Sequence, residues 1–362
     1  MLQHLKRILI VDDSPFMCEC LSQVVNTDPH LAVVGVAHDG VEAVALVPKL
    51  HPDLVIMDIN MPRMDGFEAT KQIMAYHPTP ILIVSSAEAN RGAERACRAL
   101  GYGALEVLER EPLEVSGRAG VVGGELLRRV NSLVEMSVIT HPLARLERPI
   151  IARPTAEPFA ALPASEERLL AVAASTGGPQ AVSALLKMLP KPLPCAVAVV
   201  QHISSGFTRG LVEWLEAEAQ RPVRMAIHGA RMEPGTVYIA PTDTHLRIAG
   251  HGIMRLTDEP LCDGQRPSGT VLFSSVASAY RERAIGVILS GMGSDGAEGL
   301  RHLKAAGGVV MAQDERSCVV FGMPKAAIQL GVVDRVLPVD QMAEAVVQLL
   351  RQPLPVRRNG RH

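Results

Sequence analysis

Residues 171–181 read AVAASTGGPQA, where an apolar run that begins at Leu169 gives way to a glycine-rich bend. A helical pattern of apolar residues follows the bend, so the segment predicts a strand–turn–helix unit. Ser175 then lies at the carboxyl end of the strand, beside helix N-terminal N–H groups that favour negative charge. We therefore treat Ser175 as a candidate nucleophile, with a helix N-cap or a plain phosphate-binding loop as the alternatives.

The composition is that of an ordinary globular protein. The chain has 362 residues, of which 48% are hydrophobic and 20% charged, enough for about two domains. Only 3% are aromatic, so the core must be aliphatic. The net charge of −2 gives no indication of a nucleic-acid partner or of binding to a membrane surface.

The cysteines and the apolar runs indicate a cytoplasmic protein. Six cysteines form no CxxC pair, and most lie in apolar runs, as expected for free thiols in a reducing compartment. The first apolar run is short and ends in two aspartates, unlike a signal peptide. No run approaches the ~18 apolar residues that a membrane helix needs, so we expect no membrane insertion.

Residues 7–100 alternate between short apolar runs and helical patterns. Such alternation predicts an α/β domain with a doubly wound parallel sheet. The expected strands are Arg7–Val11, Leu31–Ala37, Asp53–Met57 and Pro80–Val84. The expected helices are Pro15–Asn26, Val41–Leu50, Phe67–Tyr76 and Arg91–Leu100.

Carboxylates follow two of these strands. Asp12 and Asp13 come after the first strand and Asp58 after the third, while Ser85 ends the fourth. Carboxylates crowded at one sheet edge repel each other, and a hard divalent cation such as Mg²⁺ removes the repulsion. Asp58 could then act as a nucleophile toward phosphorus. The alternative is that these residues are simply polar strand ends.

The motifs VDDSP, MDINMPRMDG and IVSSAEA make residues 6–112 resemble a two-component response-regulator receiver domain, with a flavodoxin-like fold. The resemblance implies Asp58 as phospho-acceptor and Ser85 as the switch hydroxyl. It also implies a Mg²⁺ site formed by Asp12, Asp13, Asp58 and Asn60, the last through its backbone. Receivers carry a lysine just before a proline after the fifth strand, whereas Arg110 and Glu111 precede Pro112 here.

A helix and a proline-rich segment separate the two expected domains. Gly123–Val138 has an amphipathic pattern, and prolines from His141 to about Glu167 exclude a continuous helix there. We expect a receiver domain at 1–122, a helix and linker at 123–167, a catalytic domain at 168–352 and a disordered basic tail at 353–362.

The second domain is also expected to be a mostly parallel α/β fold, with a hairpin formed by Thr244–Ile248 and Ile253–Leu256. Ser175, His202 and Asp295 each follow a different short apolar strand. Because strand ends share one crevice in such sheets, they are candidates for a nucleophile, its base and the acid that orients the base. Asp295 could instead cap the helix that starts at Gly296. Rival bases are His228, His245, His251 and His302, of which His245 is the strongest.

This domain resembles the catalytic domain of the CheB family of chemotaxis protein-glutamate methylesterases. The matching motifs are ASTGGP, QHISSGF, VYIAPTDTHL, RPSGTVLFSSVA, SGMGSDGAEG and AQDERSCVVFGMPKAA. The resemblance implies a Rossmann-like fold, the triad Ser175–His202–Asp295, and an oxyanion hole of backbone N–H groups near Thr176 and Met292. Gly269 and Thr270 stand where the family usually has Val-Asp, which can alter the pocket wall.

The resemblance predicts an enzyme that hydrolyses glutamyl methyl esters on methyl-accepting chemoreceptors, with glutamine deamidation as a further activity. Ester hydrolysis would need no cofactor, and a chemotaxis-type histidine kinase would phosphorylate the receiver in the presence of Mg²⁺. An alternative is a phosphorylation-driven binding module whose second domain is catalytically degenerate. A DNA-binding regulator is disfavoured, because no helix-turn-helix signature is present and the basic tail is short.

Overall fold

The computed structural model describes residues 5–86, 90–110, 119–136 and 168–352. These residues belong to two compact units, one built mainly from residues 1–150 and the other mainly from residues 151–362. Both units are α/β structures around parallel sheets, as the sequence predicts. Among the helices described, none combines the length and the apolar character needed to cross a lipid bilayer.

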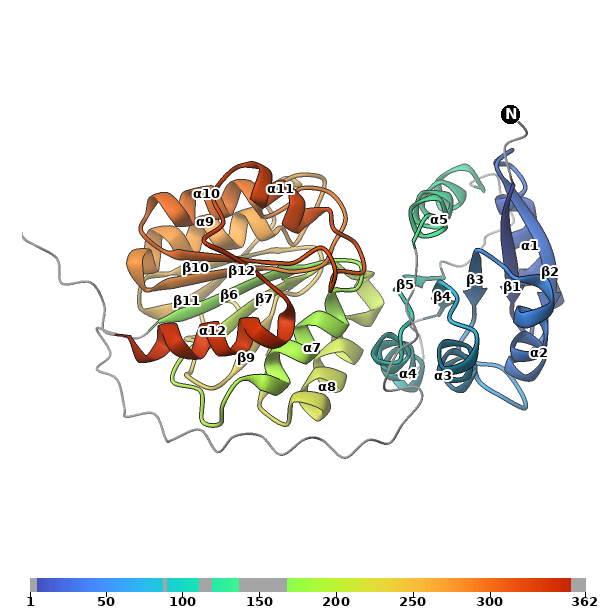
Figure 1. Cartoon of the computed structure of the whole chain (residues 1–362), viewed down its shortest axis with the longest axis horizontal. Helices are drawn as coiled ribbons and strands as arrows, with labels where there is room; N and C mark the ends of the chain where they lie inside the picture. The colour runs from blue at the N-terminus through green and yellow to red at the C-terminus, as the bar shows by residue number, and fades with distance from the viewer. Residues whose placement is uncertain (1–4, 87–89, 111–118, 137–167, 353–362) are drawn as a thin grey trace, which may run out of the picture. The chain divides into compact units, whose positions relative to one another are not determined.

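The first unit contains a five-stranded parallel sheet in the order β2-β1-β3-β4-β5. Helices α2, α3 and α4 pack side by side, and α1 packs with α5 (Figure 1). The strands are β1 (Lys6–Val11), β2 (Leu31–Ala37), β3 (Leu54–Met57), β4 (Ile81–Ser85) and β5 (Glu106–Glu109). The helices are α1 (Pro15–Val25), α2 (Gly40–Leu50), α3 (Gly66–Tyr76), α4 (Asn90–Gly101) and α5 (Ala119–Leu133).

Side-chain caps explain where three of these helices begin. Ser14, Asp39 and Asp65 each accept a hydrogen bond from the backbone N–H three residues later, at the starts of α1, α2 and α3. Each cap satisfies a donor that the helix itself leaves unpaired, which stabilises the helix by about 1 kcal/mol. The loops between strand and helix are thereby fixed at the edge where the acidic residues lie.

The helix expected at Gly123–Val138 is α5, which starts earlier and ends earlier. Its Leu126 and Val130 are buried, and Arg129 forms an ion pair with Glu106 of β5. These contacts tie α5 to the first sheet. A domain boundary at residue 122 would therefore cut through α5, whereas the proline-rich segment and the basic tail lie outside the described residues.

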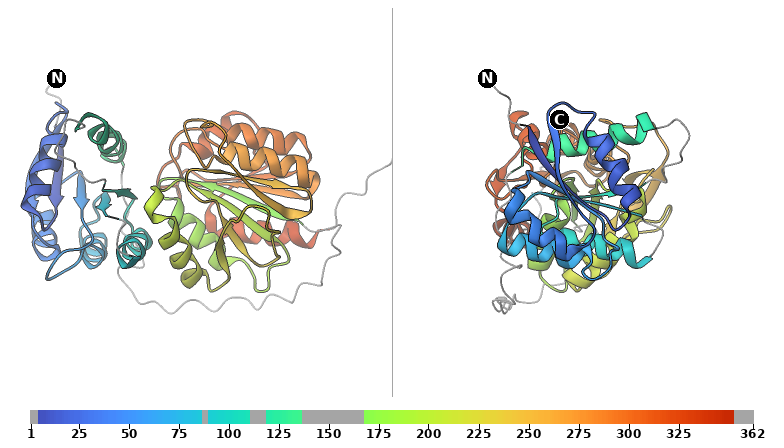
Figure 2. Two further views of the ribbon diagram at one scale, coloured as in Figure 1. Left: turned by 180° about the vertical axis from the view of Figure 1, so that it is seen from behind. Right: turned by 90° about the vertical axis from the view of Figure 1, so that its right-hand side faces the viewer.

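The second unit has a seven-stranded parallel sheet in the order β14-β13-β12-β6-β7-β9-β8, with helices on both faces (Figure 2). The strands are β6 (Leu169–Ala174), β7 (Ala196–Gln201), β8 (Val223–Met225), β9 (Val237–Ile239), β12 (Ala284–Ile288), β13 (Val309–Gln313) and β14 (Arg335–Leu337). The predicted hairpin is β10 (His245–Ala249) paired antiparallel with β11 (Ile253–Thr257).

Helices α9, α10 and α11 cover one face of this sheet, and α7, α8 and α12 cover the other (Figure 1). Their bounds are α7 (Gly178–Met188), α8 (Thr208–Ala219), α9 (Gly269–Tyr280), α10 (Ala297–Ala305), α11 (Met323–Gln329) and α12 (Val339–Arg351). The 3₁₀ turns are η2 (Ser205–Phe207), η3 (Gly250–Gly252) and η4 (Arg281–Arg283).

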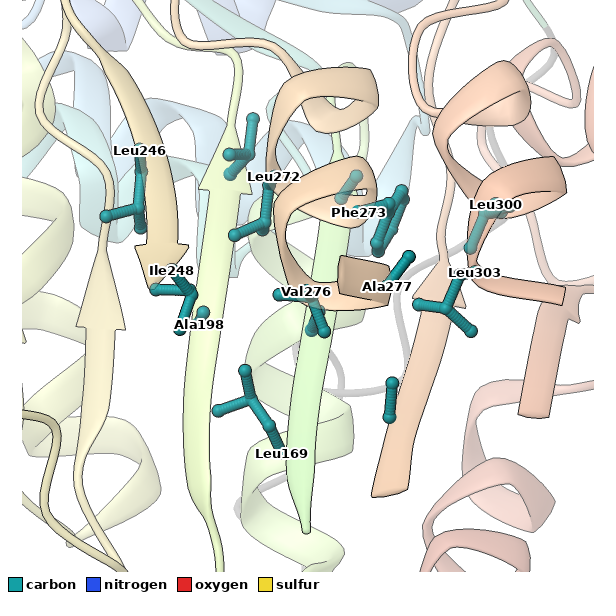
Figure 3. Packing of buried hydrophobic residues seen from close by; sticks show 14 of the residues in the cluster. Leu169, Ala198, Leu246, Ile248, Leu272, Phe273, Val276, Ala277, Leu300 and Leu303 are labelled. Atoms are coloured by element: carbon teal, nitrogen blue, oxygen red, sulfur yellow. The ribbon is translucent and has the colours of Figure 1, made fainter. Parts of the chain in front are cut away.

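Helix α9 lies at the centre of the second core. Its Leu272, Phe273 and Val276 are fully buried against residues of the sheet, of β10 and of α10 (Figure 3). Burying a side chain of this size contributes about 1.5–3 kcal/mol. The position of α9 on the sheet is therefore fixed along its length, and so is the position of its N-terminus.

Candidate active site

Ser175 lies directly after β6, on the turn that leads into α7. Its backbone N–H donates to Ser290 O at 3.0 Å, and its carbonyl accepts from Gly178 N at 2.8 Å. Gly177 has a φ of +72°, and a Cβ at this position would overlap Val319. The turn therefore requires glycine for both backbone conformation and space. Ser175 is 5% exposed, so its environment is largely shielded from water.

The strand order explains why the predicted residues can meet. The chain leaves β6 for β7 on one side, and β12 pairs with β6 on the other side. This reversal is a switch point, where the ends of parallel strands leave a crevice for ligands. Ser175 follows β6, His202 follows β7, and Asp295 lies in the loop after β12. His202 N donates to Ala174 O at 3.0 Å, which joins the ends of β6 and β7.

His202 and Asp295 are paired as the triad prediction requires. His202 Nε2 lies 2.9 Å from Asp295 Oδ2, and the two side chains are 8% and 3% exposed. With Nε2 directed at the carboxylate, Nδ1 is the ring nitrogen left for another partner.

The carboxylate of Asp295 does not cap α10, which was the alternative interpretation. Gly296 is the N-cap of α10 and provides no side-chain cap, whereas Asp295 accepts hydrogen bonds from the start of α9. Burial alone would raise the pKa of Asp295. The interactions with His202, Ser268 and Gly269 outweigh it, and hold this pKa below its usual value.

Gln201 is a functional candidate that the sequence analysis missed. It is 2% exposed and ends β7, and its Nε2 donates to Ser175 O at 2.8 Å and to His202 O at 2.9 Å. One amide thus joins the backbone of the candidate nucleophile to that of the candidate base. The available signal was a single polar residue at the end of an apolar run.

Ser290 is a second polar residue that holds the turn after β6. Ser290 Oγ donates to Thr176 O at 2.8 Å and accepts from Val320 N at 2.9 Å. Its backbone N–H donates to Gln313 Oε1 at 2.8 Å.

Thr176 is buried and Met292 is 42% exposed. The oxyanion-hole assignment of their backbone N–H groups stays a prediction.

The rival histidines lie in other settings. His245 is fully buried in β10, where its Nε2 is 3.0 Å from Pro260 O. His302 is exposed on α10, with Nδ1 2.9 Å from Ser274 Oγ. It lines a cavity of about 620 Å³ between α9 and α10, and neither Ser175 nor Asp295 belongs to that cavity.

The acidic residues of the first unit converge as predicted. One oxygen from each of Asp12, Asp13 and Asp58 lies within 4.8 Å of the others. The pKa of Asp12 is raised to about 6. Burial is the largest cause, and the charges of Asp58 and Asp13 act in the same direction, against the Ser14 N–H and the Arg110 guanidinium. Asp58 Oδ1 is buried and has no hydrogen-bond partner among the described residues. An oxygen-lined, negatively charged site with an unpaired carboxylate oxygen fits Mg²⁺.

The other predicted switch residues flank this cluster. Ser85 is buried, and its hydroxyl is without a hydrogen-bond partner in the described part of the chain. Arg110 Nη1 lies 3.1 Å from Asp12 Oδ2, and Arg110 N donates to Ser85 O at 2.9 Å. The basic side chain near the cluster is therefore Arg110, whereas Glu111 lies outside the described residues.

The loop after β3 is closely packed. The backbone N–H of Asn60 donates to Asp58 Oδ2 at 3.2 Å, and a Cβ at Gly66 would overlap the Asp58 carbonyl. The glycine of the MDG motif therefore permits α3 to start against the backbone of Asp58. The position of the Asn60 carbonyl as a metal ligand stays a prediction.

The chain is similar to known proteins along most of its length. Residues 170–346 match the family model of the CheB methylesterase, and residues 8–111 match that of the response regulator receiver domain. Two proteins of Anaeromyxobacter dehalogenans (strain 2CP-C) are named protein-glutamate methylesterase/protein-glutamine glutaminase 2 and 3. They are 44% and 45% identical, over 95% and 96% of this chain and 97% and 99% of their own lengths. The CheB methylesterase catalytic domain of Thermotoga maritima is 38% identical, with a TM-score of 0.49, and is matched over 51% of this chain and 98% of its own length.

Proposed function

The chain belongs to the CheB methylesterase family, as a methylesterase domain joined to a response regulator receiver domain, and we propose that it is a phosphorylation-regulated enzyme acting through Ser175, His202 and Asp295. Its substrates are glutamyl methyl esters on methyl-accepting chemoreceptors. Glutamine side chains are a second substrate class, which the names of the relatives support.

The proposed reaction is a two-step acyl transfer. Ser175 Oγ attacks the ester carbonyl carbon while His202 Nδ1 takes the hydroxyl proton. The tetrahedral intermediate collapses, and the protonated imidazole delivers its proton to the departing methoxide, which leaves as methanol. A water molecule, activated by the same nitrogen, then attacks the acyl-enzyme and releases the glutamate carboxylate and the free serine. With a glutamine substrate the leaving group is ammonia.

Each protein group has a stated role in this scheme. Asp295 holds the imidazole and stabilises its positive charge in the transition state. Backbone N–H groups near Thr176 and Met292 would stabilise the oxyanion, a contribution usually worth several kcal/mol. Protein groups supply the nucleophile, the base and the orienting acid, so the scheme calls for no cofactor in ester hydrolysis.

The observation that carries this proposal is the hydrogen bond of 2.9 Å between His202 Nε2 and Asp295 Oδ2. It lies at the sheet edge where Ser175 occupies a glycine-dependent turn beside the N-terminus of α7. The alternative, a binding module with a degenerate second domain, would not need these groups retained.

Replacing the nucleophile tests the proposal directly. We expect Ser175→Ala to nearly abolish methanol release from methylated receptor membranes, leaving only the binding and oxyanion contributions of roughly 10³–10⁴ over water. Ser278→Ala on the exposed side of α9 is the matched control. Substantial activity of the Ser175 variant at equal folded concentration would assign the chemistry to another group.

The receiver is proposed to take a phosphoryl group on Asp58 from a chemotaxis-type histidine kinase. The carboxylates of Asp12, Asp13 and Asp58, with the Asn60 carbonyl, would hold Mg²⁺, which supplies charge neutralisation during phosphoryl transfer. The buried Ser85 hydroxyl would donate to a phosphoryl oxygen, and Arg110 would have to leave Asp12 to do the same.

A further inference from the structure

Asp295 receives donors from both its predicted partner and the start of α9. Ser268 Oγ donates to Oδ1 at 2.6 Å, Gly269 N to Oδ2 at 2.6 Å and Thr270 N to Oδ1 at 3.1 Å. His202 Nε2 completes the set on Oδ2 at 2.9 Å. A carboxylate offers about four acceptor directions, so every direction on Asp295 is occupied.

We propose that Ser268 is a positioning residue of the methylesterase. It holds the Asp295 carboxylate in the orientation that keeps the His202 proton on Nε2 and the lone pair on Nδ1. This inference rests on the proposed function, because it assumes that His202 and Asp295 act as base and orienting acid.

The directions of these hydrogen bonds fix the proton on the imidazole. Backbone N–H groups can only donate, so Gly269 and Thr270 each require an acceptor. Ser268 Oγ accepts from Val271 N at 3.4 Å, which leaves its proton for Asp295. Asp295 therefore has no direction left for a proton of its own, and is an ionised acceptor. Nε2 of His202 must donate to it, and Nδ1 carries the lone pair.

No other side chain donates to Asp295 Oδ1 in the described part of the chain. Without the Ser268 hydroxyl, Asp295 Oδ1 would be held by the longer bond of 3.1 Å from Thr270 alone. Ser268 is fully buried, so solvent water has no access to restore the lost donor. The backbone behind the carboxylate is held separately, since Gly296 N donates to Thr270 Oγ1 at 2.8 Å. Loss of the hydroxyl would therefore free the carboxylate rather than the loop.

Ser268 is also the N-cap of α9, so the test must separate capping from positioning. Glycine is tolerated at N-caps nearly as well as serine but supplies no hydroxyl, whereas threonine both caps and keeps the hydroxyl. The pair Ser268→Gly and Ser268→Thr therefore varies the hydroxyl while both variants retain a residue suited to the cap. Circular dichroism and the thermal midpoint check that each variant of the full chain is folded.

We expect Ser268→Gly to lower kcat for methanol release by roughly 10–100-fold, the loss typical of one hydrogen bond to a charged group. KM should stay within about twofold, and Ser268→Thr should recover most of kcat. Nitrogen-15 NMR of histidine-labelled protein should show a protonated Nε2 and an unprotonated Nδ1 for His202. The Nε2–H resonance, sharp in the unmodified protein and in Ser268→Thr, should broaden in Ser268→Gly, because the freed Asp295 carboxylate moves between orientations.

Two results would overturn the proposal: unchanged kcat in folded Ser268→Gly, or an Nε2–H resonance that the variant leaves unaltered. If either variant does not fold, Ser268→Ala is compared by the same two measurements. Ser175→Ala is assayed in the same series. Activity in Ser175→Ala would remove the proposed function, whereas the His202 spectrum would still decide whether Ser268 holds the Asp295–His202 pair.

Discussion

Asp295 combines a structural role with its proposed chemical role in one side chain. Its carboxylate accepts from Gly269 N and Thr270 N at the start of α9, where the N–H groups have no helical partners. A negative charge at this end of a helix is worth about 0.3–2 kcal/mol, more where the site is buried. The same charge faces His202, so the helix that stabilises the anion also sets the direction of the imidazole.

The first prediction concerns the charge of Asp295. We expect Asp295→Asn to fold and to lose about 10⁴ in kcat, the cost of this change in serine proteases, because the amide would donate to His202 and favour the wrong tautomer. The measurement is the initial rate of methanol release. Asp258→Asn makes the same chemical change at an exposed carboxylate, and should stay close to the unmodified rate. A rate of Asp295→Asn within tenfold of normal would restrict Asp295 to a structural role.

The second prediction concerns pH. The pKa of Asp295 is lower in the folded chain than its unfolded value of 3.8. The folded chain therefore binds fewer protons at acid pH than the unfolded chain, and the ionised carboxylate stabilises the fold above about pH 4. This contribution is lost as the pH falls through the lowered pKa. Hydrogen-exchange protection of the Gly269 and Thr270 amides should therefore drop below about pH 4. The same drop in Asp295→Asn would show that another group titrates.

At the level of elements, the ends of β6 and β7 behave as one unit. Gln201 donates to the carbonyls of Ser175 and His202, and His202 N donates to Ala174 O. A Cβ at Gly178 would overlap Gln201 Oε1, so α7 begins against the same amide. The backbones of Ser175 and His202, the proposed nucleophile and base, are thereby joined by the sheet and one buried side chain.

The third prediction follows from that bridge. Gln201→Met keeps the shape but removes both donors. The Ser175 carbonyl keeps Gly178 N as a partner, so the main cost, about 1–3 kcal/mol, comes from the His202 carbonyl. We expect a lower free energy of unfolding in urea, and a lower kcat because Ser175 and His202 lose their common anchor. Gln348→Met, at an exposed position of α12, is the control and should change neither quantity. An unchanged kcat in folded Gln201→Met would mean that backbone pairing alone sets the geometry.

The elements that sequence could predict are those with long apolar runs. The strands β1 to β4 and the hairpin β10–β11 lie within one residue of their expected bounds. The edge strands β8 and β14 were not expected, because each has only three residues. Edge positions bury only part of a strand, so their sequences carry a weak pattern.

Some residues of the candidate site could also be predicted from local sequence patterns, and others could not. Ser175, His202 and Asp295 could be predicted because each follows a buried strand, and His202 and Asp295 are indeed paired. Ser268 could not be predicted as a partner of Asp295, since 27 residues separate them and its local pattern indicates only a helix cap. Likewise, the choice between Arg110 and Glu111 depends on the register of β5 against β4, which no local pattern encodes.

At the scale of the whole chain, a receiver domain and a methylesterase domain are joined by one polypeptide. The proline-rich linker predicted from the sequence at residues 141–167 would give the two domains an effective concentration for each other on the order of mM. A weak intramolecular contact can therefore regulate the enzyme. Arg110 adds a feature of this chain, because its guanidinium already pairs with the buried Asp12.

The last prediction is that the unphosphorylated receiver inhibits the esterase, and that phosphorylation at Asp58 relieves the inhibition in part. A phosphoryl group brings about −1.5 to −2 charge and three acceptor oxygens for Ser85 and Arg110. A full shift from 1:99 to 99:1 needs ~5.5 kcal/mol, and Arg110 must first give up Asp12, so we expect incomplete activation.

Initial rates of methanol release are compared for four samples: the full chain, the full chain with Mg²⁺ and a small phosphodonor, Asp58→Asn with the same additions, and a fragment starting near residue 165. The phosphodonor should accelerate the unmodified chain but not Asp58→Asn, and the fragment should be the fastest sample. If the fragment is no faster than the unphosphorylated chain and the phosphodonor has no effect, the receiver serves for targeting and not for inhibition.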